Sequence, residues 1–305
     1  MLSQSPPNLN NALHSSSSAA TEHVVSELLE QLPEQVFVEQ HPRYKALQNS
    51  YWSGYQMALC ARGRCLFAVK SGGHGHFAGQ SSIEGGIQID LVNLKMLRIN
   101  RSESTVLVGP GNTWGSVYEK LQKESLIVVG GRAANFGVGG YLIGGGISFY
   151  AAQHGWGIDN VRSFEIVLAN GRVVTTSSES EANLYRALRG GGSNFGIITA
   201  FELEAYPYHR MWGGRTLVNS IHARQAIAAY EGFVKMQQTD SQGHTIFIAT
   251  YDEGPLRLTQ YMVYTEPQGD LPIFEELRKV PTIESSLGLT DYTTLAQSIA
   301  GLHVT

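Results

Sequence analysis

A glycine-rich loop with two histidines, from Lys70 to Ser82, is the stretch whose residue types and spacing could best support chemistry. It follows the apolar run 66–69, which is typical of a short buried strand. Successive glycines permit positive φ angles and a close approach of the main chain to a ligand, while free N–H groups and serine hydroxyls can bind an anion. The loop is therefore a candidate binding site at the end of a strand.

His74 stands at the centre of this loop, and the loop alone leaves three roles open for it. It could be a turn histidine that is hydrogen-bonded to the backbone. It could share a metal ion with His76, but no Cys, Asp or Glu nearby has the spacing that would complete a metal site. The third role is that of a histidine facing a bound cofactor.

Two further glycine clusters follow, at 130–148 and at 189–196. So many glycines are costly in conformational entropy unless a ligand or close packing needs their backbone, and both explanations stay open for the first of these clusters. Its spacing fits neither the Rossmann fingerprint nor a P-loop. The glycines at 189–196 follow a helix predicted from Glu181 to Arg189, so a helix C-cap explains some of them.

The elements around the clusters are predicted from periodicity. A polar, serine-rich tail over 1–20 is expected to be disordered, and a helix follows from Thr21 to Leu32. Asn170-Gly171 predicts a hairpin with a type I′ turn. The other elements expected before Pro207 are strands at 86–91, 104–108, 164–169, 172–176 and 197–203, and a helix capped by Thr113 with Trp114, Val117, Tyr118 and Leu121 on one face.

Beyond Tyr208 the glycines become fewer, which indicates a second domain of mixed helices and strands. Its predicted elements are helices at 223–236 and 272–280 and strands at 245–251 and 256–265, and residues 281–305 predict a helix fragment at best. Tyr251, Tyr261 and Tyr264 lie on these strands and could line a pocket, although strand tyrosines more often pack than catalyse.

Composition excludes several function classes. The length of 305 residues is typical of about two domains. A net charge of −4 without any cluster of Lys or Arg argues against nucleic acid and anionic membranes as partners. No apolar run reaches the roughly 20 residues of a membrane span, and no signal peptide is recognised, so an intracellular location is favoured. Cys60 and Cys65 could be free thiols or a disulfide.

Taken together, the motifs of this sequence resemble, in type and order, those of the FAD-linked oxidases. The resemblance is closest to the berberine-bridge-enzyme-like group, whose FAD-binding domain is shared with p-cresol methylhydroxylase and vanillyl-alcohol oxidase. It extends from about Tyr51 to Pro207. The motifs are Ser71-Gly72-Gly73-His74, Gly137-Val138-Gly139-Gly140, Gly144-Gly145-Gly146, Asp159-Asn160-Val161, the 164–176 hairpin and the run from Leu184 to Gly196.

The resemblance implies an α+β protein with a two-subdomain FAD-binding fold over 21–207, followed by an incomplete α+β substrate domain over 208–305. It also implies FAD as the cofactor, held by a covalent bond from a His74 ring nitrogen to the flavin 8α-methyl group. Such a bond raises the flavin potential and fixes the ring. Main-chain N–H groups of both glycine loops would cradle the pyrophosphate, and Gly196 and Ile198 would line the adenine end. The residues implied to bind FAD are His74, Ser71, Gly72, Gly73, Gly75, His76, Ser81, Gly137, Val138, Gly139, Gly140, Tyr141, Gly144, Gly196 and Ile198, and no metal is expected.

Three departures from the family pattern stand out. Ala133 occupies a position where some members carry a second flavin-bonded cysteine, so a single bond is implied. Tyr141 replaces a frequent histidine and is either a neutral donor near the flavin or a packed aromatic residue. A strand–helix unit near 54–64 and a long C-terminal part of the relatives have no counterpart, which indicates a shortened member of the family.

The implied reaction is oxidation of a small organic molecule, which passes a hydride to FAD, with O2 then reoxidising the flavin to give H2O2. Relatives of this compact type often work in secondary metabolism, and many are secreted. The alternative is a non-catalytic or degenerate flavin-binding remnant. No catalytic base is assigned, because the family's base often comes from the part that has no counterpart here.

Overall fold

The computed structural model describes residues 22–31, 66–77, 80–83, 86–251, 254, 256–269 and 271–301. Its first element is a helix at 22–31, which confirms the helix expected in this region. The expected tail at 1–20, the region 54–64 and both cysteines lie outside the described residues.

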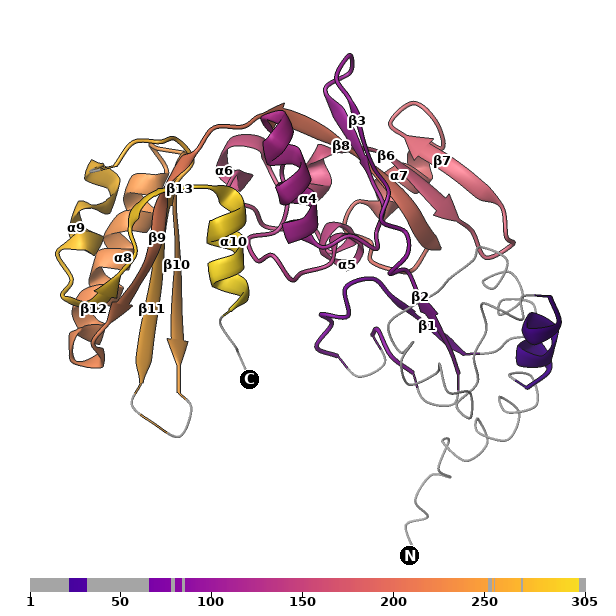
Figure 1. Cartoon of the computed structure of the whole chain (residues 1–305), viewed down its shortest axis with the longest axis horizontal. Helices are drawn as coiled ribbons and strands as arrows, with labels where there is room; N and C mark the ends of the chain where they lie inside the picture. The colour runs from indigo at the N-terminus through magenta and orange to yellow at the C-terminus, as the bar shows by residue number, and fades with distance from the viewer. Residues whose placement is uncertain are drawn as a thin grey trace, which may run out of the picture.

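A six-stranded sheet, called here the first sheet, forms the middle of the molecule (Figure 1). Its order is β3-β4-β8-β6-β7, and β5 also pairs with β8. All six strands are antiparallel to their neighbours, and the long β8 joins three of them. The strands are β3 (Leu97–Asn100), β4 (Thr105–Val108), β5 (Leu126–Val128), β6 (Val161–Val167), β7 (Val173–Ser177) and β8 (Ile197–Pro207). Strands β3 and β5 were not predicted.

The β6–β7 hairpin is confirmed, but the predicted turn type is wrong. The Gly171 N–H donates to the Leu168 carbonyl at 2.8 Å, so Ala169 and Asn170 are the central residues of the turn. A type I′ turn needs positive φ at both central residues, whereas only Gly171, which follows them, has a positive φ, of +82°. The connection is therefore one residue longer than a two-residue loop and ends on a left-handed glycine.

A parallel two-stranded sheet of β1 (Phe67–Lys70) and β2 (Ile87–Asp90) supports the histidine loop. The buried side chain of Ile89 packs against Val167 of the first sheet. Lys70 and Asp90 form an ion pair of 3.3 Å across this small sheet. The histidine loop therefore starts from a strand that is fixed to the main core.

Short helices border the first sheet, and the longest of them was predicted correctly. Thr113 caps α4 (Trp114–Leu121), and its hydroxyl accepts a hydrogen bond from the Ser116 N–H. The other helices are α5 (Val138–Ile143), α6 (Ala151–His154) and α7 (Ala182–Leu188). Helix α5 begins inside the second glycine cluster.

A five-stranded sheet, called here the second sheet, has the order β10-β11-β9-β12, and β13 also pairs with β9. Helices α8 and α9 pack on one face, where Phe233 and Leu277 of these helices cluster with Met262 of the sheet. The opposite face contributes Tyr261 and Val263 to the core of the first sheet. The elements are β9 (Met211–Val218), α8 (Ala223–Gln237), β10 (Gly243–Thr250), β11 (Arg257–Tyr264), α9 (Glu275–Arg278), β12 (Thr282–Ser285) and β13 (Gly288–Thr290).

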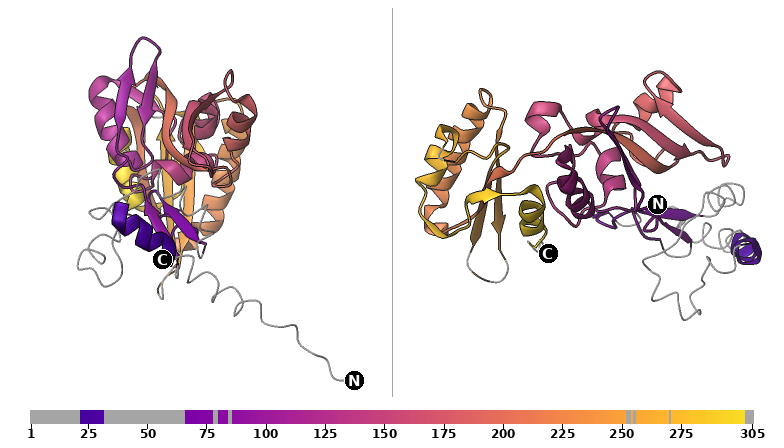
Figure 2. Two further views of the ribbon diagram at one scale, coloured as in Figure 1. Left: turned by 90° about the vertical axis from the view of Figure 1, so that its right-hand side faces the viewer. Right: turned by 45° about the horizontal axis from the view of Figure 1, so that its top comes forward.

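The last helix, α10 (Tyr292–Ala300), leaves the second sheet and packs beside α4 (Figures 1 and 2). Tyr292, Leu295 and Ala296 on this helix are buried in the core of the first sheet. The expectation of a helix fragment at best after residue 280 was too weak, since β12, β13 and α10 all lie there. The start of α10 could have been recognised in the sequence, because Asp291 is a residue type that favours the N-cap position. In the structure, its carboxylate accepts a hydrogen bond from the Thr294 N–H.

The core of the first sheet can be tested at Phe201. This side chain is fully buried on β8, with its ring centroid 5.8 Å from that of Phe164. Phe201→Ala leaves a cavity and is expected to lower the free energy of unfolding by about 3–5 kcal/mol. Ile227→Ala is the control, because Ile227 on α8 is 59% exposed, and it should change the free energy of unfolding by less than about 0.5 kcal/mol. Chemical denaturation of both variants measures the difference, and equal effects would contradict this core.

Candidate functional site

The histidine loop and the second glycine cluster meet backbone to backbone. A Cβ built on Gly72 would lie 2.5 Å from Gly137 N, and one built on Gly137 would lie 2.4 Å from Gly72 N. No side chain fits at either position, because real Cβ atoms do not approach backbone so closely. The structure thus brings together two of the three predicted glycine clusters.

Ser71 fixes this junction through two hydrogen bonds. Its hydroxyl donates to the Pro110 carbonyl at 2.6 Å and accepts from the Gly139 N–H at 3.2 Å. The Val138 N–H donates to the Asn112 carbonyl at 3.0 Å. The N–H groups of Val138 and Gly139, expected to cradle a pyrophosphate, are therefore already used within the protein, as is the Ser71 hydroxyl.

The remaining expected donors lie on open backbone. Gly72, Gly73, His74, Gly75 and Gly140 are all exposed, and Gly73 has a positive φ of +68°. A Cβ built on Gly140 would meet no atom within 4 Å. Gly144 ends helix α5 and is also exposed, whereas Ser81 is half-buried.

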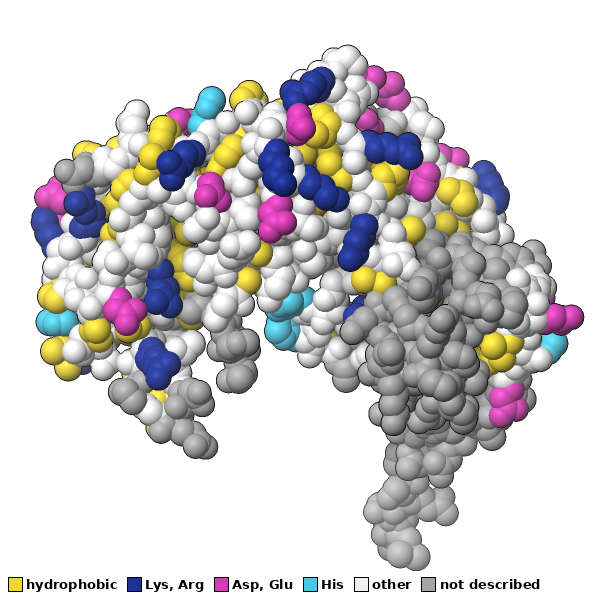
Figure 3. Space-filling model, in the orientation of Figure 1, with side chains coloured by type: hydrophobic (Ala, Val, Ile, Leu, Met, Phe, Trp, Pro, Cys, Tyr) yellow, Lys and Arg dark blue, Asp and Glu magenta, His cyan; other side chains and the backbone are white. Residues whose placement is uncertain are grey.

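His74 lies exposed against the second glycine cluster. Its ring centroid is 3.8 Å from that of Phe136, with the two planes tilted by 44°. The ring of His76 is 5.9 Å away. In Figure 3 the lower edge of the molecule is hollowed, and exposed histidine side chains lie beside the hollow. Among the described residues, no group of three or more His, Cys, Asp or Glu side chains is arranged to hold a metal ion.

Tyr141 is packed inside the site. Its ring meets Trp114 edge to face at 5.1 Å, and its hydroxyl is buried with no hydrogen-bond partner among the described residues. Burial raises the pKa of this phenol well above its ordinary value, because the charged form would be desolvated. Tyr141 is therefore a neutral donor that lacks an acceptor.

The third glycine cluster joins the end of helix α5. The Gly192 N–H donates to the Ile143 carbonyl at 3.3 Å. Gly196 has a φ of +151°, and a Cβ there would lie 2.4 Å from the Val167 carbonyl oxygen. Ile198 is only 8% exposed and packs in the core of the first sheet, so its side chain cannot line a ligand site without movement.

The three candidate strand tyrosines do not gather at a pocket. Tyr261 is fully buried and donates to the Ser298 carbonyl at 3.0 Å. Tyr264 packs edge to face with Phe274 on the face of the second sheet that α8 and α9 cover. Tyr251 lies just past β10 and is 76% exposed. Packing is the role that the first two residues have in this structure.

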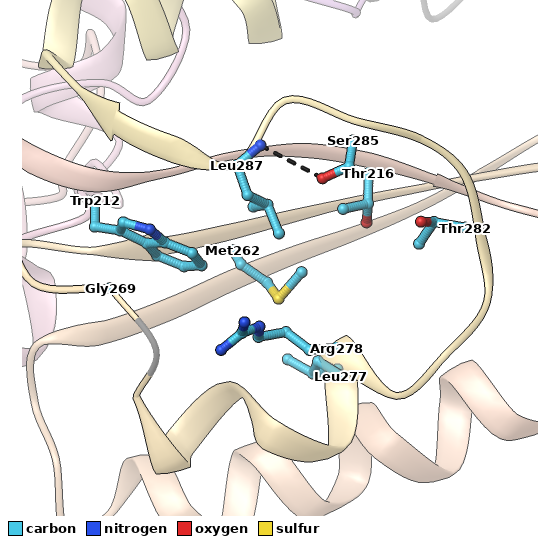
Figure 4. A pocket seen from close by; sticks show the side chains of 9 residues that line it. All are labelled: Trp212, Thr216, Met262, Gly269, Leu277, Arg278, Thr282, Ser285 and Leu287. Carbon is cyan, nitrogen blue, oxygen red and sulfur yellow. Dashed lines mark hydrogen bonds between the residues drawn. The ribbon is translucent and has the colours of Figure 1, made fainter.

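One cavity of about 520 Å³ lies away from the glycine clusters, between the second sheet and helix α9 (Figure 4). Trp212, Met262 and Arg278 face one another across it, and hydroxyl side chains of the sheet edge complete its wall. It lies on the helix-covered face of that sheet, whereas Tyr261 on the opposite face joins the first core. None of the residues predicted to bind a ligand lines it.

Several residues that shape the site were not predicted. Phe136 contacts His74, and the Tyr118 hydroxyl donates to the Gly131 carbonyl at 2.7 Å. Tyr292 reaches the same segment from α10. The helical spacing of Trp114 and Tyr118 was visible in the sequence, but the sequence does not indicate which loop these two side chains contact.

No helix among the described residues is long and apolar enough to cross a membrane.

Comparison with known proteins relates part of this chain to an FAD-binding domain. Residues 56–177 match the model of the FAD binding domain. The chain is 38% identical over 227 residues to the FAD-dependent monooxygenase sdcF of Emericella nidulans, a match that covers 73% of this chain and 47% of that protein. The chain thus spans about half the length of this relative.

Solved structures share the fold at low sequence identity. Superposition on 6-hydroxy-D-nicotine oxidase from Arthrobacter nicotinovorans gives a TM-score of 0.75 at 21% identity, covering 88% of this chain and 64% of that one. Glucooligosaccharide oxidase from Acremonium strictum, described with a 6-S-cysteinyl, 8α-N1-histidyl FAD, gives 0.73 at 17% identity, covering 92% and 64%. The sequence matches and the shared fold agree with the resemblance to the FAD-linked oxidases, and residues 56–177 of this chain match the FAD binding domain.

Proposed function

We propose that this chain binds FAD covalently through His74 and acts as an oxidase-type oxidoreductase on a small organic molecule. The observation that carries the proposal is the junction of Gly72 with Gly137, which places the exposed His74 ring directly beside the second glycine cluster. Two glycine loops joined in this way leave open backbone on both sides of one histidine. The open backbone could bind the phosphates of a ligand, and the histidine lies where it could contact a flat ring of the same ligand.

The residues present fit FAD in two respects. Gly73, Gly75 and Gly140 are exposed, and a Cβ built on Gly140 would meet no atom within 4 Å, which suits close approach of that backbone to a pyrophosphate. The Tyr141 hydroxyl is a protonated donor without an acceptor among the described residues, and because it is buried, a flavin carbonyl oxygen would accept from it only after the Tyr141 ring moves. Val138 and Gly139 do not contribute free donors, and we assign them instead to the junction with Ser71.

His74 supports a single covalent bond to FAD. Its imidazole is exposed, so a ring nitrogen is accessible for bonding to the flavin 8α-methyl group. Ala133, where a second bonding residue would stand, is buried and has no nucleophile. When bound, FAD would accept a hydride from the substrate and pass two electrons to O2, which gives H2O2. Phe136 would restrict the rotation of the His74 ring and so orient the bond.

Monooxygenation is the second candidate function. It is favoured by the name of the relative from Emericella nidulans, an FAD-dependent monooxygenase, whereas the solved neighbours are named oxidases. The two chemistries differ in the fate of O2: an oxidase releases one H2O2 per substrate oxidised, and a monooxygenase places one oxygen atom in the product. Secondary metabolism is consistent with such fungal relatives.

The covalent bond is tested by acid precipitation of the purified protein. We expect flavin absorbance to stay with the wild-type pellet and to disappear from the pellet of His74→Ala. His76→Ala is the matched control, because it removes an exposed imidazole from the same loop but leaves His74 in place, so the flavin that this variant binds should stay with its pellet. Flavin that remains in the His74→Ala pellet would contradict the tether, and a wild-type protein without any flavin would contradict the proposed function.

The two loops are tested separately by a glycine pair. Gly137→Ala forces a Cβ against the Gly72 backbone and is expected to lower the free energy of unfolding by about 1–3 kcal/mol. Gly140→Ala enters open space within a helix, so it should leave the apoprotein at least as stable but lower its flavin content. Thermal denaturation of apoprotein and flavin-to-protein ratios measure both effects. Normal flavin content in Gly140→Ala would remove Gly140 from the binding site.

A further inference from the structure

Helix α10 makes hydrogen bonds to the same segment that borders His74. The segment comprises residues 130–137 and is called here the flavin-side segment. The Ala134 N–H donates to the Ala296 carbonyl on α10 at 3.0 Å, and the Ala134 carbonyl accepts from the Gly115 N–H on α4 at 2.9 Å. One residue of the segment is therefore held between two helices, of which α10 follows the strands of the second sheet.

Tyr292 provides the second attachment. Its hydroxyl donates to the Gly130 carbonyl at 3.3 Å and lies 3.2 Å from the Ser148 hydroxyl. Since the single phenolic proton is used toward Gly130, the Ser148 hydroxyl donates to Tyr292, and it accepts from the Tyr150 N–H at 3.2 Å. A continuous chain of hydrogen bonds thus crosses from one end of the second glycine cluster to the other through Tyr292.

This chain is fully enclosed. Tyr292 is 0% exposed, and its ring lies 4.3 Å from Tyr118 and 5.6 Å from Phe149. No water can replace the phenol without a cavity, so each polar group depends on its protein partner. The backbone N–H of Tyr292 is also fixed, because it donates to the Tyr208 hydroxyl at 3.1 Å.

The attachment extends to the histidine loop. The Phe136 carbonyl, near the end of the flavin-side segment, accepts from the Trp114 N–H at 2.9 Å, and the Phe136 ring contacts His74. The position of the ring beside His74 therefore depends on a backbone segment that α4 holds on one side and α10 holds on the other.

We propose that α10 clamps the flavin-side segment and that Tyr292 is a positioning residue for the cofactor. The proposal rests on the proposed function for its link to FAD. It implies that the second sheet, through its last helix, controls how well the first sheet's loops hold and orient the flavin. Tyr292 does not touch the reacting atoms and acts through Gly130 and Ser148.

The test compares three tyrosine-to-phenylalanine variants of the 305-residue chain. Tyr292→Phe removes the bond to Gly130, and Tyr118→Phe removes the neighbouring bond to Gly131. Tyr261→Phe is the matched control, because it deletes a buried tyrosine hydroxyl that also bonds to α10, at Ser298, but not to the flavin-side segment. Thermal denaturation shows whether the three substitutions cost similar stability.

Two readouts separate the clamp from general destabilisation. Apoprotein is mixed with FAD, and the rate of formation of acid-stable flavin is recorded with its visible spectrum. We expect this rate to fall about tenfold in Tyr292→Phe and Tyr118→Phe, since each leaves a buried carbonyl without its donor, and to stay unchanged in Tyr261→Phe. Amide hydrogen exchange of residues 130–137 in apoprotein should accelerate in the first two variants only.

The outcomes are distinguishable from failure of the proposed function. If wild-type protein forms no flavin adduct, the proposed function fails, and hydrogen exchange alone still decides whether α10 clamps the segment. If wild-type protein binds flavin but Tyr292→Phe matches Tyr261→Phe in rate, spectrum and exchange, the positioning role is wrong. Should Tyr292→Phe fail to fold, Ser148→Ala provides the second test, because it removes the hydroxyl that bonds to Tyr292 and leaves helix α10 unchanged. A rate and a hydrogen exchange equal to those of wild type would then contradict the positioning role.

Discussion

The contact between Gly72 and Gly137 is the constraint on which the site depends. Two loops separated by more than sixty residues touch through backbone atoms alone, since a Cβ on either glycine would lie within 2.5 Å of the other loop. Ser71 then bonds to both Pro110 and Gly139 across the same junction. Gly72 and Gly137 are therefore required for the close contact between the loops. Only neighbours such as Gly140 leave the backbone open to a ligand. The segments contain many glycines because close packing of the loops and exposed backbone are both needed within a few residues.

Buried aromatic side chains pack around the glycine segment next to that junction. Trp114, Tyr118 and Tyr292 are all fully buried, and the hydroxyls of the two tyrosines bond to the adjacent carbonyls of Gly131 and Gly130. These carbonyls lie in the segment 130–137, which forms neither a helix nor a strand. Tyrosine suits the position because one side chain supplies both apolar contact and a single directed donor. The segment is ordered by its neighbours and not by local propensity.

The sequence predicted local elements well and tertiary partners poorly. Periodicity located α4 and α8, because each helix buries one face, and continuous strand-like runs located β10 and β11. The type I′ turn at Asn170-Gly171 was wrong, since the dipeptide alone does not reveal that the loop is one residue longer. Val138 and Gly139 were predicted as donors because a glycine motif shows where N–H groups are and not which acceptors the fold brings to them. Partners such as Tyr292 and Gly130 lie 162 residues apart, and no spacing rule connects them.

The last helix shows why the two sheets cannot be treated as independent functional parts. In a modular arrangement, a cofactor domain would hold its ligand with its own residues, and a substrate domain would meet it only at the surface. Here Ala134 is bonded by its N–H to α10 and by its carbonyl to α4, so the peptide next to the histidine loop is shared. Any displacement of the second sheet that moves α10 must either break this bond or carry the flavin-side segment along. Movement of the second sheet would therefore change the backbone position beside His74, because the groups between them are packed and hydrogen-bonded with no flexible linker.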